Sequence, residues 1–512
     1  MNQITMSNIE ITGSALTLED VVRVARYKVP VKLSGESVSR MEQSRNFVEK
    51  LLREKRVVYG LTTGFGKFSD KYISAEDTIR LQTNLIRSHA CGMGNPFAEE
   101  IVRAILLLRV NALALGYSGI RVALVGTMVE MLNKNVVPVI PEQGSLGASG
   151  DLAPLSHLAL VIIGEGEAFY QGRRMSGRDA MELAGIPVMT LEAKEGLALI
   201  NGTQVMTAVG ALSCWDAIQL SKWADGAAAL TCEALLGVRD AFAAETHDIR
   251  PHQGQQEVAA NIRRLIEGSR LITNQGEIRV QDAYSLRCVP QVHGASRDTL
   301  TYAAAKLEIE LNSATDNPLI FPETERVISG GNFHGQPIAL AMDYLSICVS
   351  ELANISERRT ERLVNPHLNE GLPAFLAKDG GVNSGFMIAQ YAAAAIVSEN
   401  KSLAHPASVD SIPSSGNQED HVSMGTIGAR KAAQIVNNAY KVLAVELVCA
   451  AQAVDFRNPS LLGTGTKRIY DRLREQVAFL DQDRALSADF ERIAAWMKQP
   501  GVVAELLEDG EV

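Results

Sequence analysis

The segment GSLGASGDLAPLSH, residues 144–157, joins a glycine-rich loop to an apolar stretch that begins at Leu152. Other polar connectors also precede or start segments with helical periodicity: residues 59–66 (YGLTTGFG), 88–94 (SHACGMG), 201–204 (NGTQ), 281–287 (QDAYSLR), 330–337 (GGNFHGQP) and 416–421 (GNQEDH). The amino end of a helix carries partial positive charge and free N–H groups. Gathered at one point, these connectors would form a strongly electropositive pocket inside an acidic protein.

The rest of the sequence predicts a mainly α fold. Apolar residues recur at helical spacing, which predicts helices over residues 96–115, 203–238, 298–312, 336–363, 385–401 and 423–454. Strand signals are short: Val57 to Tyr59, residues 136–140, and a hairpin over 168–175 that turns at Gln171-Gly172. Such long helices favour a long central helical bundle. We predict an N-terminal domain, residues 1–200, that carries the 144–154 loop, and a central bundle with a C-terminal helical region, residues 201–512.

Composition excludes several classes of partner. The chain has 512 residues, with 49 Lys and Arg against 59 Asp and Glu, a net charge of −10. This balance argues against nucleic acid or an anionic membrane as the main partner. The sequence contains no CxxC pair and no HExxH motif, so we expect no metal site. The six dispersed cysteines predict reduced, core-filling thiols. With no secretory signal apparent, we expect a cytoplasmic protein.

The tripeptide Ala148-Ser149-Gly150 suggests unusual backbone chemistry. In a tight turn the Gly150 nitrogen can attack the Ala148 carbonyl, and glycine suits that position because a side chain would obstruct the approach. Loss of two waters then turns Ser149 into an exocyclic methylene, within a 4-methylidene-imidazol-5-one (MIO). The alternative is an ordinary glycine-rich turn that caps a helix beginning near Asp151 and Pro154.

The surrounding sequence favours the first interpretation. GSLGASGDLAPLSH resembles the signature of the MIO-dependent aromatic amino-acid lyases and aminomutases, and the resemblance extends from YGLTTGFG to NQEDH, over nearly the whole chain. Within that family the segments NGTQ, VQDAYSLRCVPQVHGA and GGNFHGQPIALAMD are most similar to those of the histidine-specific ammonia-lyases. The resemblance implies an aromatic ammonia-lyase (fumarase/aspartase-like) architecture. It also implies a homotetramer whose active sites combine loops from three subunits.

The resemblance assigns roles to several residues around the electrophile. It implies that Tyr59 is the catalytic base, with Tyr284 assisting near the MIO. Positive potential at converging helix ends favours a phenolate, which supports a tyrosine base. Arg287 matches the family's carboxylate-binding arginine, and its planar guanidinium can bind a carboxylate bidentately. Asn201 and Gln281 are neutral amides that the resemblance places in the pocket, as possible donors to the MIO carbonyl or the substrate.

A second group of residues is expected to select the substrate. Glu419 suits an imidazole, which can donate N–H hydrogen bonds, whereas a hydrocarbon ring would leave the carboxylate unpaired. His89 and Met387 are also expected in this pocket, and Phe333 resembles the family's aromatic residue beside the MIO. Thr62 departs from the histidine-specific pattern, which has asparagine there, and is typical of tyrosine lyases and aminomutases.

These residues predict an enzyme that acts on a small amino acid. The implied reaction is conversion of L-histidine to trans-urocanate and ammonia, with MIO formed from Ala148, Ser149 and Gly150 and no metal. Two alternatives stay open: a tyrosine ammonia-lyase or aminomutase with the same electrophile, and a non-catalytic helical scaffold. The fumarase–aspartase signature GSSxMPxKxN is absent.

Overall fold

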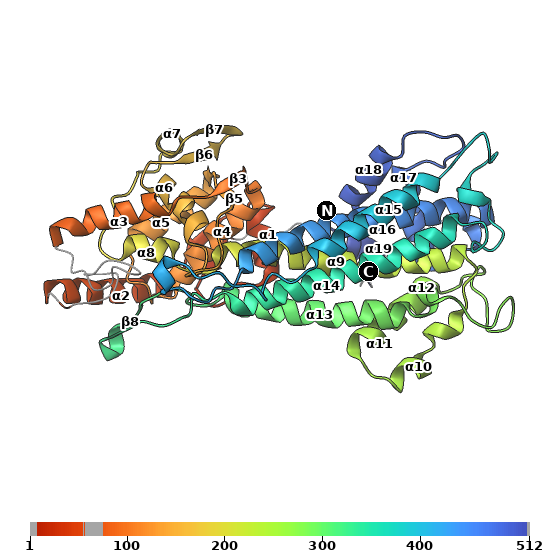
Figure 1. The fold of residues 1–512 in the computed structure, drawn as a ribbon, viewed down its shortest axis with the longest axis horizontal. Helices are drawn as coiled ribbons and strands as arrows, with labels where there is room; N and C mark the ends of the chain where they lie inside the picture. Colours follow the sequence, from red (N-terminus) through yellow and green to blue (C-terminus); the bar gives the residue numbers. More distant parts are fainter. Residues whose placement is uncertain (1–7, 55, 57–74, 509–512) are drawn as a thin grey trace.

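The computed structural model describes residues 8–54, 56 and 75–508, and most of these residues are helical (Figure 1). Up to residue 200 the helices are α1 (Leu18–Ala25), α2 (Gly35–Arg53), α3 (Ala75–His89), α4 (Glu99–Ala114), α5 (Val122–Asn133), α6 (Leu152–Ile162), α7 (Gly177–Leu183) and α8 (Glu195–Ile200). Beyond it they are α9 (Gln204–Ala234), α10 (Ala244–Asp248), α11 (Gln253–Leu265), α12 (Tyr284–Arg287), α13 (Val289–Leu311), α14 (Gln336–Val364), α15 (Met387–Leu403), α16 (Gly425–Arg457), α17 (Thr464–Gln476), α18 (Ser487–Met497) and α19 (Val502–Leu507).

The strands are short and form small separate sheets. They are β1 (Ile9–Ile11), β2 (Val31–Leu33), β3 (Met93–Pro96), β4 (Val137–Pro138), β5 (Pro141–Gln143), β6 (Glu167–Tyr170), β7 (Arg173–Ser176), β8 (Leu319–Phe321) and β9 (Arg326–Ile328). β1 and β2 are parallel, and the pairs β3–β5, β4–β6, β6–β7 and β8–β9 are antiparallel. The predicted hairpin is confirmed, with Tyr170 opposite Arg173 and positive φ angles at Gln171 and Gly172.

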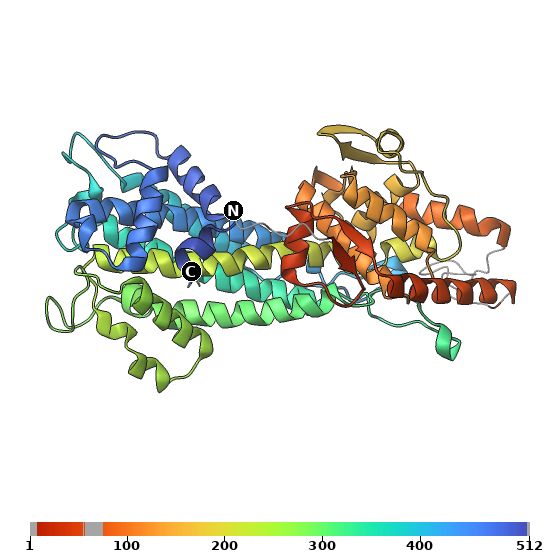
Figure 2. The same cartoon turned by 180° about the vertical axis from the view of Figure 1, so that it is seen from behind.

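A bundle of long helices forms the body of the molecule. α9, α13, α14, α15 and α16 pack along one another, whereas α2 to α8 gather at one end (Figures 1 and 2). α9 has 31 residues and is therefore about 45 Å long. It is alanine-rich and buried along most of its length, which lets α14 and α16 approach closely.

The long helices occur where the periodicity predicts them. α9, α14, α15 and α16 end within a few residues of the expected limits. α13 begins at Val289, nine residues before the predicted start at 298, because Pro290 suits the first turn of a helix and the polar stretch after it stays helical. One hydrophobic cluster extends from Ile9 to Leu507. The division at residue 200 stays a prediction, and the expected strand at residues 57–59 lies outside the described residues.

A buried polar chain joins four helices of the bundle. Asp225 of α9 lies 2.9 Å from Nδ1 of His293 on α13, and Nε2 of His293 lies 3.4 Å from the guanidinium of Arg359 on α14. Arg359 donates two hydrogen bonds to Glu446 of α16. All four side chains are almost completely buried. Because each charge has partners inside the bundle, this chain fixes the mutual register of the helices.

α14 is long and apolar enough to cross a membrane by length and composition alone, in the part of the chain that the structure describes. About two thirds of its most apolar window, 67%, is buried inside the fold. This burial against α13, α15 and α16 is the environment of a core helix.

Candidate functional site

The residues 147–150 form a tight turn with an unusual backbone. Gly147, Ser149 and Gly150 all have positive φ angles, of 84°, 52° and 78°. A Cβ atom at Gly150 would lie 2.1 Å from the Gly202 carbonyl oxygen, and one at Gly147 would lie 2.2 Å from Oγ of Ser423. A serine with positive φ is strained, and no residue but glycine fits beside it at either position.

The turn is held against Gly202, which precedes α9. The Asp151 amide donates to the Gly202 carbonyl at 2.7 Å, and the Gly202 amide donates to the Ser149 carbonyl at 3.3 Å. These bonds fix the peptides on both sides of Gly150. The compact turn, the strained Ser149 and the glycine at the attacking position all fit the residues that an MIO group requires.

Asp151 is a structural anchor of this turn, and its role was not predicted. The alternative interpretation of the sequence was a turn that caps α6, and the side chain of Asp151 makes no cap hydrogen bond to that helix. Its carboxylate is fully buried and accepts hydrogen bonds from the amides of Val205 and Met206, both at 2.9 Å, and from the hydroxyls of Ser145 and Thr426. Burial raises the pKa of Asp151, and these hydrogen bonds oppose the shift. The sequence feature that could have indicated this role is the acidic residue directly after Ala148-Ser149-Gly150.

Glu419 reaches the turn from the segment before α16. Oγ of Ser149 donates to Oε1 of Glu419 at 3.1 Å, and Oγ of Ser414 donates to Oε2 at 3.2 Å. His89, at the end of α3, lies within electrostatic range of the Glu419 carboxylate. Burial lowers the pKa of His89, while a hydrogen bond to the Leu85 carbonyl and the Glu419 charge oppose that shift. The structure therefore places a carboxylate against Ser149 and an imidazole within electrostatic range of that carboxylate.

The loop that contains Phe333 lies at the same end of the molecule. The imidazole of His334 lies 3.3 Å from the His421 carbonyl, and a Cβ at Gly335 would lie 3.2 Å from Oγ of Ser423. Phe333 is half-buried in this loop, before α14 begins. The position of Phe333 beside the MIO stays a prediction.

Asn201 lies directly before Gly202 and is 2% exposed. Its Nδ2 atom faces the Asn317 carbonyl at 3.0 Å and Oδ1 of Asp316 at 3.4 Å. Its Oδ1 atom is buried and has no hydrogen-bond partner among the described residues. We expected an amide that donates to the MIO or the substrate, but the donor side of Asn201 is already engaged within the chain.

Gln281, Tyr284 and Arg287 lie together at α12. The guanidinium carbon of Arg287 lies 4.6 Å from the centre of the Tyr284 ring, and its Nε donates to the Asp282 carbonyl at 2.9 Å. Tyr284 is 70% exposed, and Gln281 is exposed as well. This cluster faces outward from the chain that carries it.

Within one chain, the α12 cluster lies far from Ser149. Asp151 binds the amides at the start of α9, whereas Asp282 accepts from the amide of Val238, just beyond the other end of α9, at 2.7 Å. Most of the length of α9, about 45 Å, therefore separates the two groups (Figure 1).

Met387, the first residue of α15, lies at the α12 end. The preceding residue, Phe386, donates its amide to the Phe375 carbonyl at 2.9 Å. The adjacent Leu376 carbonyl accepts a bond from Gln452, near the end of α16 that is remote from the Ser149 turn. Within a single chain the connectors therefore do not all meet at one point. The helix starts that carry the site residues divide between two ends of the bundle.

Three further expectations concern the Tyr59 segment, metal binding and the cysteines. Tyr59 and Thr62 lie outside the described residues. Among residues 8–54, 56 and 75–508 no group of three or more His, Cys, Asp and Glu side chains could hold a metal ion. The expectation of buried thiols is wrong for Cys91, which is exposed because it lies in the loop after α3, and Cys288 is only partly buried.

Comparisons with known proteins agree with this geometry. The family model for aromatic amino acid lyases matches residues 16–475. A histidine ammonia-lyase from Alkaliphilus metalliredigens is 61% identical over 501 residues, covering 98% of this chain and 99% of the relative.

Two solved structures have the same fold. The crystal structure of histidine ammonia-lyase from Trypanosoma cruzi superposes with a TM-score of 0.92 at 42% identity, covering 98% of this chain and 95% of that one. A tyrosine aminomutase from Streptomyces globisporus superposes with a TM-score of 0.95 at 42% identity, covering 98% of this chain and 100% of that one. The match over nearly the whole length, together with the strained Ser149 turn, shows that the chain belongs to the aromatic amino acid lyase family.

Proposed function

We propose that the protein is a histidine ammonia-lyase, which eliminates ammonia from L-histidine and releases trans-urocanate. The observation that carries this function is the contact between Glu419 and Ser149, because it places a carboxylate beside the reactive turn. An imidazole can donate an N–H to that carboxylate, whereas a phenyl ring cannot. The relatives that are 55–61% identical are histidine ammonia-lyases, and the tyrosine aminomutase is more distant at 42%.

We infer that Ala148, Ser149 and Gly150 form MIO without a metal. The group supplies an electrophile that makes the substrate amine a better leaving group. Side chains of the protein bind and orient the substrate and remove its β proton. Glu419 and His89 orient the imidazole, and Arg287 holds the carboxylate bidentately. Tyr59 takes the β proton.

A complete site requires more than one copy of the chain. Within one chain, most of the length of α9 lies between Ser149 and the α12 segment that carries Arg287 and Tyr284. One amino acid nevertheless has to reach both groups. The exposed α12 cluster of one copy is therefore proposed to face the Ser149 turn of another, in a homotetramer with shared active sites. The partner chains also complete the pocket around Met387.

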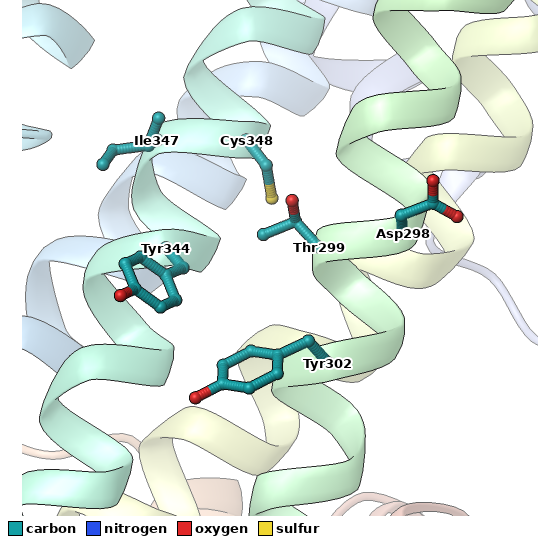
Figure 3. A pocket seen from close by; sticks show the side chains of 6 residues that line it. All are labelled: Asp298, Thr299, Tyr302, Tyr344, Ile347 and Cys348. Carbon is teal, nitrogen blue, oxygen red and sulfur yellow. The ribbon is translucent and has the colours of Figure 1, made fainter. Parts of the chain in front are cut away.

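An exposed apolar surface on α13, α14 and α15 supports association between copies. Its exposed side chains are Tyr302, Tyr344, Ile347, Ile388 and Tyr391. Part of this surface is a pocket of about 380 Å³, in which the Tyr302 and Tyr344 rings lie 5.8 Å apart and which Cys348 also lines (Figure 3). None of the predicted site residues lines the pocket. Apolar faces of this kind are typical of obligate interfaces between identical chains.

Product analysis tests the proposed function. The purified chain is incubated separately with L-histidine and L-tyrosine, and urocanate, coumarate and β-tyrosine are quantified by chromatography. We expect urocanate from L-histidine with a far higher kcat/KM than any tyrosine product, and no turnover by Ser149→Ala. Mass spectrometry of the peptide 144–154 is expected to show loss of two waters in the native chain only. Preferred conversion of tyrosine, or turnover with an intact serine, would contradict the proposal.

A tyrosine lyase or aminomutase is the second candidate. The TM-score of 0.95 to the tyrosine aminomutase favours it at the level of the fold, and Thr62 and His89 are compatible with it. Glu419 discriminates less sharply against tyrosine than against phenylalanine, because a phenol can donate its O–H to a carboxylate. The relatives at 55–61% identity, which are histidine ammonia-lyases, favour the first candidate. Detection of β-tyrosine as the main product would establish this function instead.

We further propose a cytoplasmic location. The six cysteines are all free thiols, which is typical of proteins in a reducing compartment. Fractionation of cells that express the tagged chain tests the location.

A further inference from the structure

His157 of α6 connects this helix to the loop that follows His89. The Gly92 amide lies 3.0 Å from Nε2 of His157 and donates to it. A backbone N–H can only donate, so Nε2 is the unprotonated nitrogen and the ring is neutral, with its proton on Nδ1. Burial lowers the pKa of His157, which favours this neutral form. The helix that follows the Ser149 turn therefore supplies a hydrogen-bond acceptor to the loop at residues 89–94.

This loop is packed tightly between α6 and the segment that precedes the turn. A Cβ atom at Gly92 would lie 3.0 Å from Nε2 of His157 and 3.2 Å from Cβ of Pro141. A Cβ atom at Gly144 would lie 3.1 Å from Cα of Gly92. β3, which continues the loop, pairs with β5. Because the segments are in close contact, a change in the hydrogen bond at Gly92 has to move the loop.

His89 is joined to this contact by a short backbone turn. The Cys91 amide donates to the His89 carbonyl at 2.8 Å, and the next amide along the chain is the one that binds His157. An ion pair between Arg87 and Glu165 also joins α3 to the segment after α6, but it is largely open to solvent and is therefore weak. His157 thus fixes the backbone three residues after His89.

We propose that His157 is a positioning residue for the substrate pocket: its imidazole holds the 89–94 loop, and through this loop the His89 ring, where that ring meets the imidazole of the substrate. The inference rests on the proposed function, in which His89 and Glu419 orient the substrate. His157 acts through Gly92 and His89. A contact that is equally strong in the ground state and the transition state contributes to KM and not to kcat. Loss of His157 should therefore raise KM.

Steady-state kinetics of three variants test the proposal. His157→Leu removes the acceptor, Gly92→Ala disturbs the same contact from the loop, and His157→Gln supplies an amide oxygen that can accept from Gly92. We expect His157→Leu to raise KM for L-histidine about three- to tenfold, because one hydrogen bond is lost. Its kcat should stay within about twofold of the native value. Gly92→Ala should act in the same direction and carries the test if His157→Leu does not fold. His157→Gln should keep a KM close to the native value.

Hydrogen exchange of the peptide 88–96 follows the loop without any turnover. Its amides should exchange faster in His157→Leu than in the native chain, and at the native rate in His157→Gln. His247→Leu is the matched control, because it removes another buried histidine, which binds the Ala241 carbonyl beside α10, at the opposite end of the molecule (Figure 1). This control should leave KM and the exchange of the peptide unchanged. The two-water loss in peptide 144–154 should persist in His157→Leu.

The outcomes distinguish this inference from the proposed function. An unchanged KM in both His157→Leu and Gly92→Ala would overturn the positioning role, even with faster exchange. An equal rise in KM when His157→Leu is added to His89→Ala would overturn it as well, because a residue that acts through His89 has no further effect once that ring is absent. A native chain that does not convert L-histidine would contradict the proposed function, while the exchange of the loop would still decide whether His157 holds it.

Discussion

At the scale of single residues, Gly150 is a position that leaves no room for a side chain. A Cβ atom there would lie 2.1 Å from the Gly202 oxygen, at a φ of 78°. We expect Gly150→Ala to abolish both the two-water loss in peptide 144–154 and the turnover of L-histidine, measured by mass spectrometry and urocanate absorbance. Gly172→Ala is the matched control, since Gly172 has nearly the same φ, 75°, and nothing within 4 Å of a Cβ. Equal loss in both variants would show that strain, and not the contact with Gly202, is responsible.

Glu419 gives a second prediction at this scale. Replacing its carboxylate with an amide removes a charged acceptor from the imidazole, so kcat/KM for L-histidine should fall about ten- to a hundredfold in Glu419→Gln. Asp420→Asn changes the exposed neighbouring acid and should keep normal kinetics. Initial rates over a range of L-histidine concentrations provide the measurement. A Glu419→Gln enzyme with unaltered kcat/KM would remove the main argument for histidine specificity.

The roles of single residues could be predicted from the sequence only where they depend on neighbouring residues. The glycines and Ser149 were predictable because their chemistry depends on three consecutive residues. The partners of Asp151 were not, since Val205 and Thr426 come from distant helices. The surroundings of Asn201 were equally hidden, because Asp316 and Asn317, which face its Nδ2 atom, come from a distant part of the chain.

At the scale of elements, Asp151 connects three of them: the Ser149 turn, the start of α9 and the start of α16. Asp151→Asn replaces one acceptor oxygen with a donor that faces N–H and hydroxyl groups. We expect a loss of about 2–4 kcal/mol in the free energy of unfolding, because buried donors are left unpaired. Denaturant titration measures the loss. Asp179→Asn, on the exposed first turn of α7, should unfold like the native chain.

The chain of buried side chains through His293 predicts a pH dependence. Burial lowers the pKa of His293, so the unfolded state binds a proton first as the pH falls below about 6.5. The free energy of unfolding should therefore be highest above pH 6.5 and decrease below it, by up to about 1.4 kcal/mol per pH unit for each such group.

Denaturant titrations between pH 5.5 and 7.5 measure this slope. His293→Gln should make it shallower without removing it, since burial also lowers the pKa of His157 and His247. A slope that stays the same in His293→Gln would assign the dependence to other groups.

The elements themselves were largely predictable, for a physical reason. Long helices such as α14 and α16 repeat one apolar pattern over many turns, so the signal accumulates. The early start of α13 was missed because the residues after Pro290 are too polar to display a periodic face. Their burial comes from neighbouring helices, which the local sequence does not specify.

At the scale of the whole molecule, the shared site predicts complementation. Ser149→Ala and Arg287→Ala should each be inactive alone. When they are co-expressed, a site that takes Ser149 from one variant and Arg287 from the other is intact, so activity should recover to about a quarter of the native level by random mixing. Urocanate production by the purified mixture measures the recovery.

A second pair of variants provides the control. Ser149 and Glu419 belong to the same chain end and contact each other. Ser149→Ala mixed with Glu419→Ala should therefore not exceed the low activity of Glu419→Ala alone. Recovery in this pair, or none in the first, would contradict a site that is divided between copies.

Because helix α9 is uninterrupted, it limits which insertions and deletions the sequence can accept during evolution. One of its ends anchors the acid behind the turn, and the other anchors the segment that supplies the arginine to a neighbouring copy. Deleting a single amino acid between them would rotate one end by about 100° and shorten the spacing by about 1.5 Å. Insertions should be accepted in the hairpin tip at Gln171-Gly172, where no site residue lies. The number of residues in α9, by contrast, has to stay constant, because it sets the distance between the two ends.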